Sequence, residues 1–347
     1  MTNTRFPRFV AALAMASSLA LPAGTARAEN FQSEFDKVFG KELRTPREVQ
    51  TTVRPFVAPI APPTYGGSLE ATLANLANAS LGRIGVAAMD LGTGRAVAVM
   101  GDQPFPMAST SKIAIAATYL DLVDQGRLKL SDRFPLLLPQ RSARFSSPAA
   151  PVRPGTMLTA QGLIELSITR SDNPATDALL AAVGGPAAVN RWLRKAGLSG
   201  MRLDRDIATL VRDDGEFNPA TTVDLRDSAT PLAMVQLLAG LNQGRWLSNS
   251  SRGVLLGAME RCLTGKRRLR AMLPLEARVA HKTGTLNNTS SDVGIIHTPD
   301  GRAIAIAIYV TGQGGKANRE YRIASISRAV YDGYLTESSS LRRTASR

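Results

Sequence analysis

Three short segments contain the residue types that nucleophilic catalysis needs, and the first of them pairs a serine with a lysine. In Ser109-Thr110-Ser111-Lys112 the serine and the lysine stand three positions apart, so on a helix their side chains share one face. A serine hydroxyl is a weak nucleophile and needs an adjacent base. A lysine can act as that base when burial, a second cation or the positive start of a helix lowers its pKa. The same spacing also fits a serine that merely caps a helix.

The second segment, Ser171-Asp172-Asn173, lies between two predicted helices and is followed by Pro174. Its structural interpretation is a helix start, with Asn173 as the N-cap and Pro174 at the first helical position. Its functional interpretation is a proton relay through the Ser171 hydroxyl to a leaving nitrogen, together with an amide contact from Asn173 to a substrate.

The third segment, Lys282-Thr283-Gly284-Thr285, ends a predicted strand. A glycine lets a ligand approach the backbone closely, and a lysine and threonine hydroxyls can hold a carboxylate. A plain turn explains the same residues. Each segment alone is a weak indication, but the three together, in this order and on these elements, are a strong one.

The elements that must position these segments are strands at the two ends of the chain and helices between them. Turn signals at Gly92-Thr93-Gly94 and Pro299-Asp300-Gly301 join neighbouring strands. The predicted strands cover residues 84–91, 96–100, 278–283, 293–297 and 303–310. The predicted helices cover residues 68–80, 109–124, 158–169, 174–182, 187–196, 231–241, 250–262 and 324–335.

This order predicts an α/β fold of the α+β type. One five-stranded antiparallel sheet is built from both chain ends and flanked by helices, and an all-α lobe is inserted into it. The catalytic domain is expected over residues 68–337. Its sheet lobe comprises 68–106 and 270–337, and its helical lobe 107–269. A cleft between the lobes is the expected substrate site.

The two ends of the chain have the composition of exported and unfolded segments. Residues 1–28 resemble a signal peptide, with a basic start, an apolar run and an Ala-Arg-Ala cleavage site. Residues 29–67 are rich in proline and read as a linker with one short helix near 31–39, and residues 338–347 read as a disordered tail. We therefore expect a periplasmic or secreted protein without a spanning segment.

The net charge of +14 comes from scattered arginines, which favours a basic solvated surface over a nucleic-acid site. His281 and His297 with the single Cys262 do not make a metal site, so neither a metal nor another cofactor is expected. Cys262 is expected to be a small buried hydrophobic residue, with a reactive thiol as the alternative. His281 is expected to be a strand residue beside the cleft. We expect a monomer.

The three segments resemble the class A β-lactamase family over roughly residues 68 to 335, and this resemblance implies a β-lactamase/transpeptidase-like fold. Further stretches support it: Phe105-Pro106-Met107-Ala108, Leu203-Asp204-Arg205, Thr230-Pro231, Thr264-Gly265 and Leu273-Pro274. The family acts through an acyl-enzyme on β-lactams. The implied substrate is a β-lactam or a D-alanyl peptide, with peptidoglycan as a further partner.

The resemblance also implies a role for each matching residue. Ser109 is the acylated nucleophile, Lys112 its base and Ser171 the proton relay. Asn173 contacts the substrate amide. The implied carboxylate-binding strand comprises Lys282, Thr283, Gly284 and Thr285. The implied oxyanion hole is formed by the backbone N–H groups of Ser109 and Thr285.

Many relatives have an arginine on the next strand that assists the carboxylate. Ser290 or Ser291 stands at the matching position here. Arg268 matches the place from which other relatives supply the guanidinium, although it is also one of several arginines in Lys266-Arg267-Arg268-Leu269-Arg270.

The main departure from the family is the loop that supplies the deacylation base. The family's loop glutamate stands two residues after Asp-Arg, where this chain has Ile207, and the loop is several residues longer. Asp227 is the expected closing acid and partner of Arg205. Glu216 is the candidate replacement base, with Asp206, Asp213 or Asp214 as alternatives. An ordinary solvated loop acid explains Glu216 equally well.

Without that glutamate, acylation is expected to be fast and deacylation slow, as in penicillin-binding DD-peptidases that share the fold. The primary hypothesis is a serine acyl-hydrolase that β-lactams acylate at Ser109. The alternatives are a D-alanyl-D-alanine carboxypeptidase or transpeptidase and a non-turnover β-lactam or muropeptide binding protein. A Ser-His-Asp hydrolase is disfavoured, because no Gly-x-Ser-x-Gly elbow is present.

Overall fold

A computed structural model describes residues 53–56, 67–79 and 81–345, with side chains up to residue 336. The predicted signal peptide, the predicted helix near 31–39 and most of the linker lie outside the described residues. In the part of the chain that is described, no helix is both long and apolar enough to cross a membrane.

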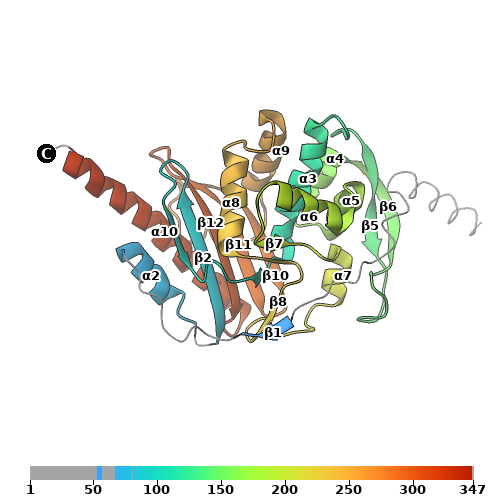
Figure 1. Cartoon of the computed structure of the whole chain (residues 1–347), viewed down its shortest axis with the longest axis horizontal. Coiled ribbons are helices and arrows are strands. Elements are labelled where there is room, and N and C mark those ends of the chain that lie inside the picture. Colours follow the sequence, from blue (N-terminus) through green and yellow to red (C-terminus); the bar gives the residue numbers. More distant parts are fainter. Residues whose placement is uncertain (1–52, 57–66, 80, 346–347) are drawn as a thin grey trace, which may run out of the picture. The chain divides into compact units, whose positions relative to one another are not determined.

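The core of the fold is a five-stranded antiparallel sheet with the order β10-β11-β12-β2-β3 (Figure 1). Two strands come from the N-terminal part of the chain and the others from its C-terminal part, as the sequence predicts. The strands are β2 (Gly82–Asp90), β3 (Ala96–Val99), β10 (Arg278–Leu286), β11 (Thr289–His297) and β12 (Ala303–Gly312).

Helices cover both faces of the sheet, which explains why the residues of its central strands β11, β12 and β2 are almost all buried. On one face α2 (Ser68–Leu76) packs against α10 (Lys316–Ala345), and Leu69, Leu73 and Ile306 share one buried cluster. On the other face α8 (Pro231–Asn242) packs against β2 and β12. Each fully buried aliphatic side chain contributes about 1.5–3 kcal/mol to stability.

The inserted lobe consists mainly of helices that begin at capping side chains. Thr159 caps α4 and Ser248 caps α9, each by accepting a backbone N–H bond. The helices of the lobe are α3 (Lys112–Asp124), α4 (Ala160–Thr169), α5 (Asn173–Ala182), α6 (Gly185–Lys195) and α9 (Asn249–Glu260).

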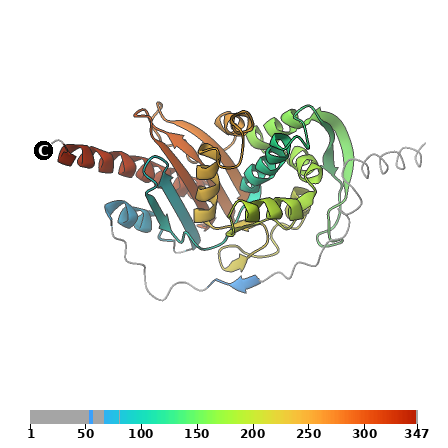
Figure 2. The ribbon, with the colours of Figure 1, turned by 45° about the horizontal axis from the view of Figure 1, so that its top comes forward.

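The expectation of an all-α lobe over residues 107–269 is wrong, because this span also contains a β-hairpin and three short strands between residues 201 and 229. β5 (Arg133–Pro139) pairs with β6 (Val152–Thr159), and the pair is visible as the green ribbon beside α4 and α5 in Figure 2. The predicted helix 158–169 therefore begins only at Ala160. Prolines and a register shift between Pro135 and Leu137 interrupt the alternating pattern that would have indicated these strands.

The two chain ends also differ from their prediction. Within the predicted linker, β1 (Val53–Pro55) pairs with β8 (Thr222–Asp224). The backbone of α10 continues to Ala345, so residues 338–345 are helical where a disordered tail was predicted. The helix starts earlier than predicted as well, at Lys316, and its buried residues such as Ile323 and Val330 pack on the sheet.

Candidate active site

Ser109 lies on a tight turn that leads directly into α3. The turn is a single 3₁₀ segment, η2 (Ala108–Ser111), and Ala108 has a left-handed backbone with φ 49°. The hydroxyl of Thr110 donates to the carbonyl of Met107 at 2.8 Å, and the hydroxyl of Ser111 donates to the carbonyl of Ala108 at 2.8 Å. These two hydroxyls are buried and used inside the turn, whereas Ser109 is half-buried. The turn thus presents Ser109 and fixes its backbone.

Lys112 and Lys282 meet at the hydroxyl of Ser171. Nζ of Lys112 lies 3.3 Å from the Oγ of Ser171, and it donates to the carbonyl of Ser171 at 2.7 Å and to Oδ1 of Asn173 at 2.7 Å. Lys282 Nζ donates to Ser171 Oγ at 2.9 Å and to the carbonyl of Thr283. All three sequence segments therefore contribute to one network, in which α3, the turn before α5 and β10 meet.

Two local features of the sequence make this meeting possible. Ser171 has φ 59°, a left-handed conformation that is rare for a non-glycine residue and common at functional sites. Asp172, and not Asn173 as predicted, is the N-cap of α5 and accepts the N–H of Ala175 at 2.8 Å. The side chain of Asn173 is consequently free to bind Lys112.

Both lysines carry a proton less readily than an exposed lysine does. Burial lowers the pKa of Lys112 well below its ordinary value, and the charge of Lys282 acts in the same direction. Burial also lowers the pKa of Lys282, to about 8. Lys112 is therefore the amine suited to accept a proton near neutral pH, and Lys282 remains the cation.

Gly284 allows β10 to approach the serine turn. A Cβ on Gly284 would lie 2.7 Å from the carbonyl oxygen of Met107 and 3.1 Å from Cβ of Ala108. Of the neighbouring residues on this strand, Thr283 is buried and bonded to Thr264, whereas Thr285 is exposed. Thr285 is therefore the hydroxyl that is open to a ligand beside Ser109.

Replacing Gly284 by alanine should separate this strand from the serine turn. Because a Cβ here meets backbone atoms, the turn must shift, and a misplacement near 1 Å can slow a reaction of the order of 10²-fold. We expect such a decrease in the rate of Ser109 acylation by a penicillin, measured by quenched-flow mass spectrometry. Gly253→Ala is the matched control, since no atom lies within 4 Å of a Cβ on Gly253. Equal rates in both variants would contradict the close approach.

Arg268 is buried directly beside the exposed threonine. Its guanidinium donates to the Oγ1 of Thr285 at 2.8 Å and to the carbonyls of Gly284 and Ser291 at 2.8 and 2.9 Å. Glu320 of α10 pairs with it at 3.2 Å. Arg268 therefore lies against the segment Lys282-Thr283-Gly284-Thr285. Of the two serines at the alternative position, Ser290 accepts a bond from Arg319.

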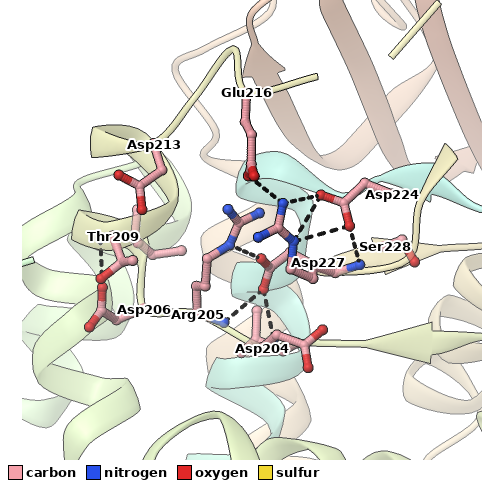
Figure 3. Close-up of polar contacts among 12 residues, drawn as sticks. Asp204, Arg205, Asp206, Thr209, Asp213, Glu216, Asp224, Asp227 and Ser228 are labelled. Atoms are coloured by element: carbon pink, nitrogen blue, oxygen red, sulfur yellow. Dashed lines mark hydrogen bonds and ion pairs between the residues drawn. The ribbon is translucent and has the colours of Figure 1, made fainter. Parts of the chain in front are cut away.

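The long loop, defined as residues 204–227, is closed by the predicted ion pair. Arg205 Nε lies 2.7 Å from Oδ2 of Asp227, and Oδ1 of Asp227 accepts the N–H groups of Asp204 and Arg205 at 2.7 and 3.0 Å (Figure 3). The carbonyl of Asp227 accepts the N–H of Met107 at 2.9 Å. Asp227 thus joins both ends of the loop to the segment that precedes Ser109.

Short strands strengthen the same connection between the loop and the serine turn. β4 (Phe105–Pro106) pairs with β9 (Ser228–Ala229), which in turn pairs with β7 (Met201–Arg202). The chain on both sides of the loop is therefore held against the strand that enters the turn.

Ile207 is buried at the start of a short helix, and an unpredicted acid holds that start in place. α7 (Ile207–Arg212) is capped by Asp206, and Asp177 of α5 accepts the N–H groups of Ile207 and Ala208 at 2.7 and 2.9 Å. Burial, with the nearby charge of Asp206, raises the pKa of Asp177. The sequence signal for Asp177 was an acid within the apolar run of α5, a position where acids are rare unless bonded.

Each candidate acid of the long loop has a structural partner. Glu216 pairs with Arg226, which also binds Asp224. Asp206 caps α7, Asp213 pairs with Arg212 at 2.7 Å, and Asp214 accepts the N–H of Asn287 at 2.8 Å. Within the described residues, none of these acids is hydrogen-bonded to Lys112, Ser171 or Lys282. The structure does not bring Glu216 into the lysine network.

Comparison with known proteins identifies the family. A model described as the beta-lactamase enzyme family matches residues 68–334. β-Lactamase CTX-M-8 of Citrobacter amalonaticus is 35% identical over 272 residues, which cover 76% of this chain and 88% of that protein. β-Lactamase CTX-M-25 of Escherichia coli is 34% identical over 265 residues, with the same shares covered.

Solved structures agree with this match. An ancestral class A β-lactamase, GNCA, has a TM-score of 0.67 and 38% identity, with 77% of this chain and 100% of that chain covered. A β-lactamase from Chitinophaga pinensis has a TM-score of 0.68 and 31% identity over the same shares. The chain belongs to the class A β-lactamase family and is a serine hydrolase of that type, as the three sequence segments predicted.

Proposed function

We propose that β-lactams acylate Ser109 of this protein and that the resulting ester is released slowly. The observation that carries the proposal is the network in which Ser171 Oγ lies 3.3 Å from Lys112 Nζ and 2.9 Å from Lys282 Nζ. A base and a proton relay beside a presented serine are the requirements of acyl transfer.

In the proposed acylation, the substrate carboxylate binds Lys282 and Thr285, with Arg268 behind them. The β-lactam carbonyl faces the backbone N–H groups of Ser109 and Thr285, each of which typically contributes about 2.7–4 kcal/mol of transition-state stabilisation. Neutral Lys112 accepts the proton of Ser109 as its oxygen attacks the carbonyl. Ser171 then passes a proton to the lactam nitrogen as the C–N bond breaks, and Lys112 replaces the proton of Ser171.

Deacylation needs a second base that activates water, and Ile207 cannot act as one. The acids of the long loop are engaged in structural bonds, as Glu216 is with Arg226. This supports a persistent acyl-enzyme.

The absence of a deacylation base at Ile207 also favours a second candidate, a D-alanyl-D-alanine peptidase that is acylated through the same network. Release of D-alanine from a peptidoglycan stem peptide, measured beside nitrocefin hydrolysis, separates the two functions.

A periplasmic or secreted location and a monomeric state are part of the proposal.

The pH profile of acylation should have two limbs. Lys112 must be neutral to accept a proton, so the rate constant kcat/KM for acylation rises with pH until Lys112 is deprotonated. Lys282 must be charged to bind a carboxylate, so the rate falls above about pH 8, the pKa of Lys282. Stopped-flow acylation across this range tests both limbs.

Lys282→Arg provides the control for the alkaline limb. Arginine keeps its charge throughout the range, so this variant should lose the decrease above pH 8 even if its overall rate is lower. A decrease that is unchanged in Lys282→Arg would assign the limb to another group.

A further inference from the structure

A second group of reactive side chains lies on the opposite face of β10 from Lys282. His281 and Thr283 share one face of this strand, because side chains alternate along it. His281, Asp292 and Cys262 are all buried, and the proposed acylation uses none of them. Their residue types can form a thiolate, an imidazolium and an orienting carboxylate.

Asp292 orients and charges the imidazole. Nδ1 of His281 lies 2.9 and 3.0 Å from the two carboxylate oxygens of Asp292, which stands on the neighbouring strand β11. Burial disfavours the charged ring, but the carboxylate outweighs it and raises the pKa of His281 to about 9. The other ring nitrogen of His281, Nε2, is buried and has no hydrogen-bond partner within the described residues. When the ring is charged, the proton on Nε2 is therefore available to a nearby acceptor.

Cys262 is the nucleophile next to this imidazolium. Burial opposes ionisation of its thiol, but His281 and Thr264 outweigh burial and lower the pKa of Cys262 to about 7. Lys282 is the other charged group that interacts with it. The residue is 8% exposed and is therefore not fully enclosed. Its surroundings are therefore polar and cationic, unlike the apolar site expected from the sequence.

Hydrogen bonds connect the thiol to the substrate strand. Sγ of Cys262 lies 3.3 Å from Oγ1 of Thr264, which lies 2.6 Å from Oγ1 of Thr283. Thr283 stands between Lys282 and Gly284. A change at the sulfur that alters its contact with Thr264 is therefore transmitted to Thr283 on this strand.

We propose that Cys262 is an oxidation site for small peroxides and that its oxidation weakens binding of substrate carboxylates at β10. The thiolate attacks one oxygen of hydrogen peroxide and the O–O bond breaks. Sulfur is oxidised by two electrons to a sulfenic acid, and the departing hydroxide takes a proton from His281 and leaves as water. The effect on carboxylates rests on the function proposed above, whereas the oxidation itself does not.

The test uses the full chain, in which Cys262 is the only cysteine. Folded protein at pH 7 is treated with hydrogen peroxide, the sulfenic acid is trapped with a cyclic 1,3-diketone, and the labelled peptide is quantified by mass spectrometry. The folded thiol should react about tenfold faster than the same thiol in protein unfolded by urea, because a larger fraction is thiolate. A folded thiol that reacts no faster than the unfolded one would overturn the proposal.

Variants and kinetics test the two remaining steps. His281→Gln and Asp292→Asn should each lower the labelling rate of the folded protein, and Cys262→Ser should take no label. Compared with unoxidised protein, oxidised wild-type protein should need a several-fold higher penicillin concentration to reach half of its maximal acylation rate. The maximal acylation rate itself should be similar. Unchanged half-saturation after oxidation would refute the effect on carboxylate binding. Failure of unoxidised protein to acylate would instead refute the proposed function and leave the labelling result intact.

Discussion

Lys112→Ala should slow acylation of Ser109 by a penicillin about 10²–10⁴-fold, the contribution that a positioned general base normally makes. Lys112 is wholly buried and its amine is bonded to Ser171 and Asn173, so few other groups can take its place. The pseudo-first-order appearance of the acyl-enzyme, followed by mass spectrometry under excess penicillin, measures the effect.

Two further variants test whether the decrease in acylation rate comes from the loss of the base. Lys112→Arg keeps a positive charge but cannot accept a proton at neutral pH, so it should be about as slow as the alanine variant. Lys266→Ala removes an exposed lysine and should acylate at the wild-type rate. An arginine variant with near wild-type acylation would show that only the charge of Lys112 is needed.

Asp227→Ala should reduce the free energy of unfolding by about 3–5 kcal/mol, the usual result of removing one member of a buried ion pair. The carboxylate of Asp227 is 2% exposed, and its loss leaves the Arg205 guanidinium and two backbone N–H groups without their partner. Urea unfolding, compared at the midpoint and slope, measures the change.

The control for Asp227 is an exposed acid. Asp102→Ala should change stability by no more than about 0.5 kcal/mol, since this carboxylate is exposed. Replacing Arg205 and Asp227 together by methionine and leucine should recover part of the loss, because no charge is then left unpaired. A loss below about 1 kcal/mol for Asp227→Ala would mean that the loop does not depend on this pair.

The sequence predicted the sheet because its signals are local. Strands such as residues 303–310 are continuous apolar runs, and the glycine turns next to them mark where they reverse. β5 and β6 lack such a pattern, since Pro135, Pro154 and Gly155 interrupt them, and packing against α5 stabilises the hairpin instead.

The site could be predicted only in part for a similar reason. Motif spacing indicated that Ser109, Lys112, Ser171 and Lys282 act together, and the Arg205–Asp227 pair was also predicted and is present. Asp177 stands 30 positions before Ile207, whose N–H it binds. Cys262 stands 19 positions before His281, with which it interacts. Only the folded chain brings such residues together, and their spacing in the sequence carries no motif.

The fate of a single penicilloyl adduct tests the central claim most directly. One equivalent of a penicillin is added to wild-type protein and to Ser109→Ala, and intact masses are recorded over time. We predict one adduct on the wild-type protein, mapped to Ser109, and no adduct on Ser109→Ala. The lifetime of the adduct should be many times longer than the time in which it forms. An adduct on the alanine variant, or immediate return of the wild-type protein to its free mass with hydrolysed penicillin in solution, would contradict the account.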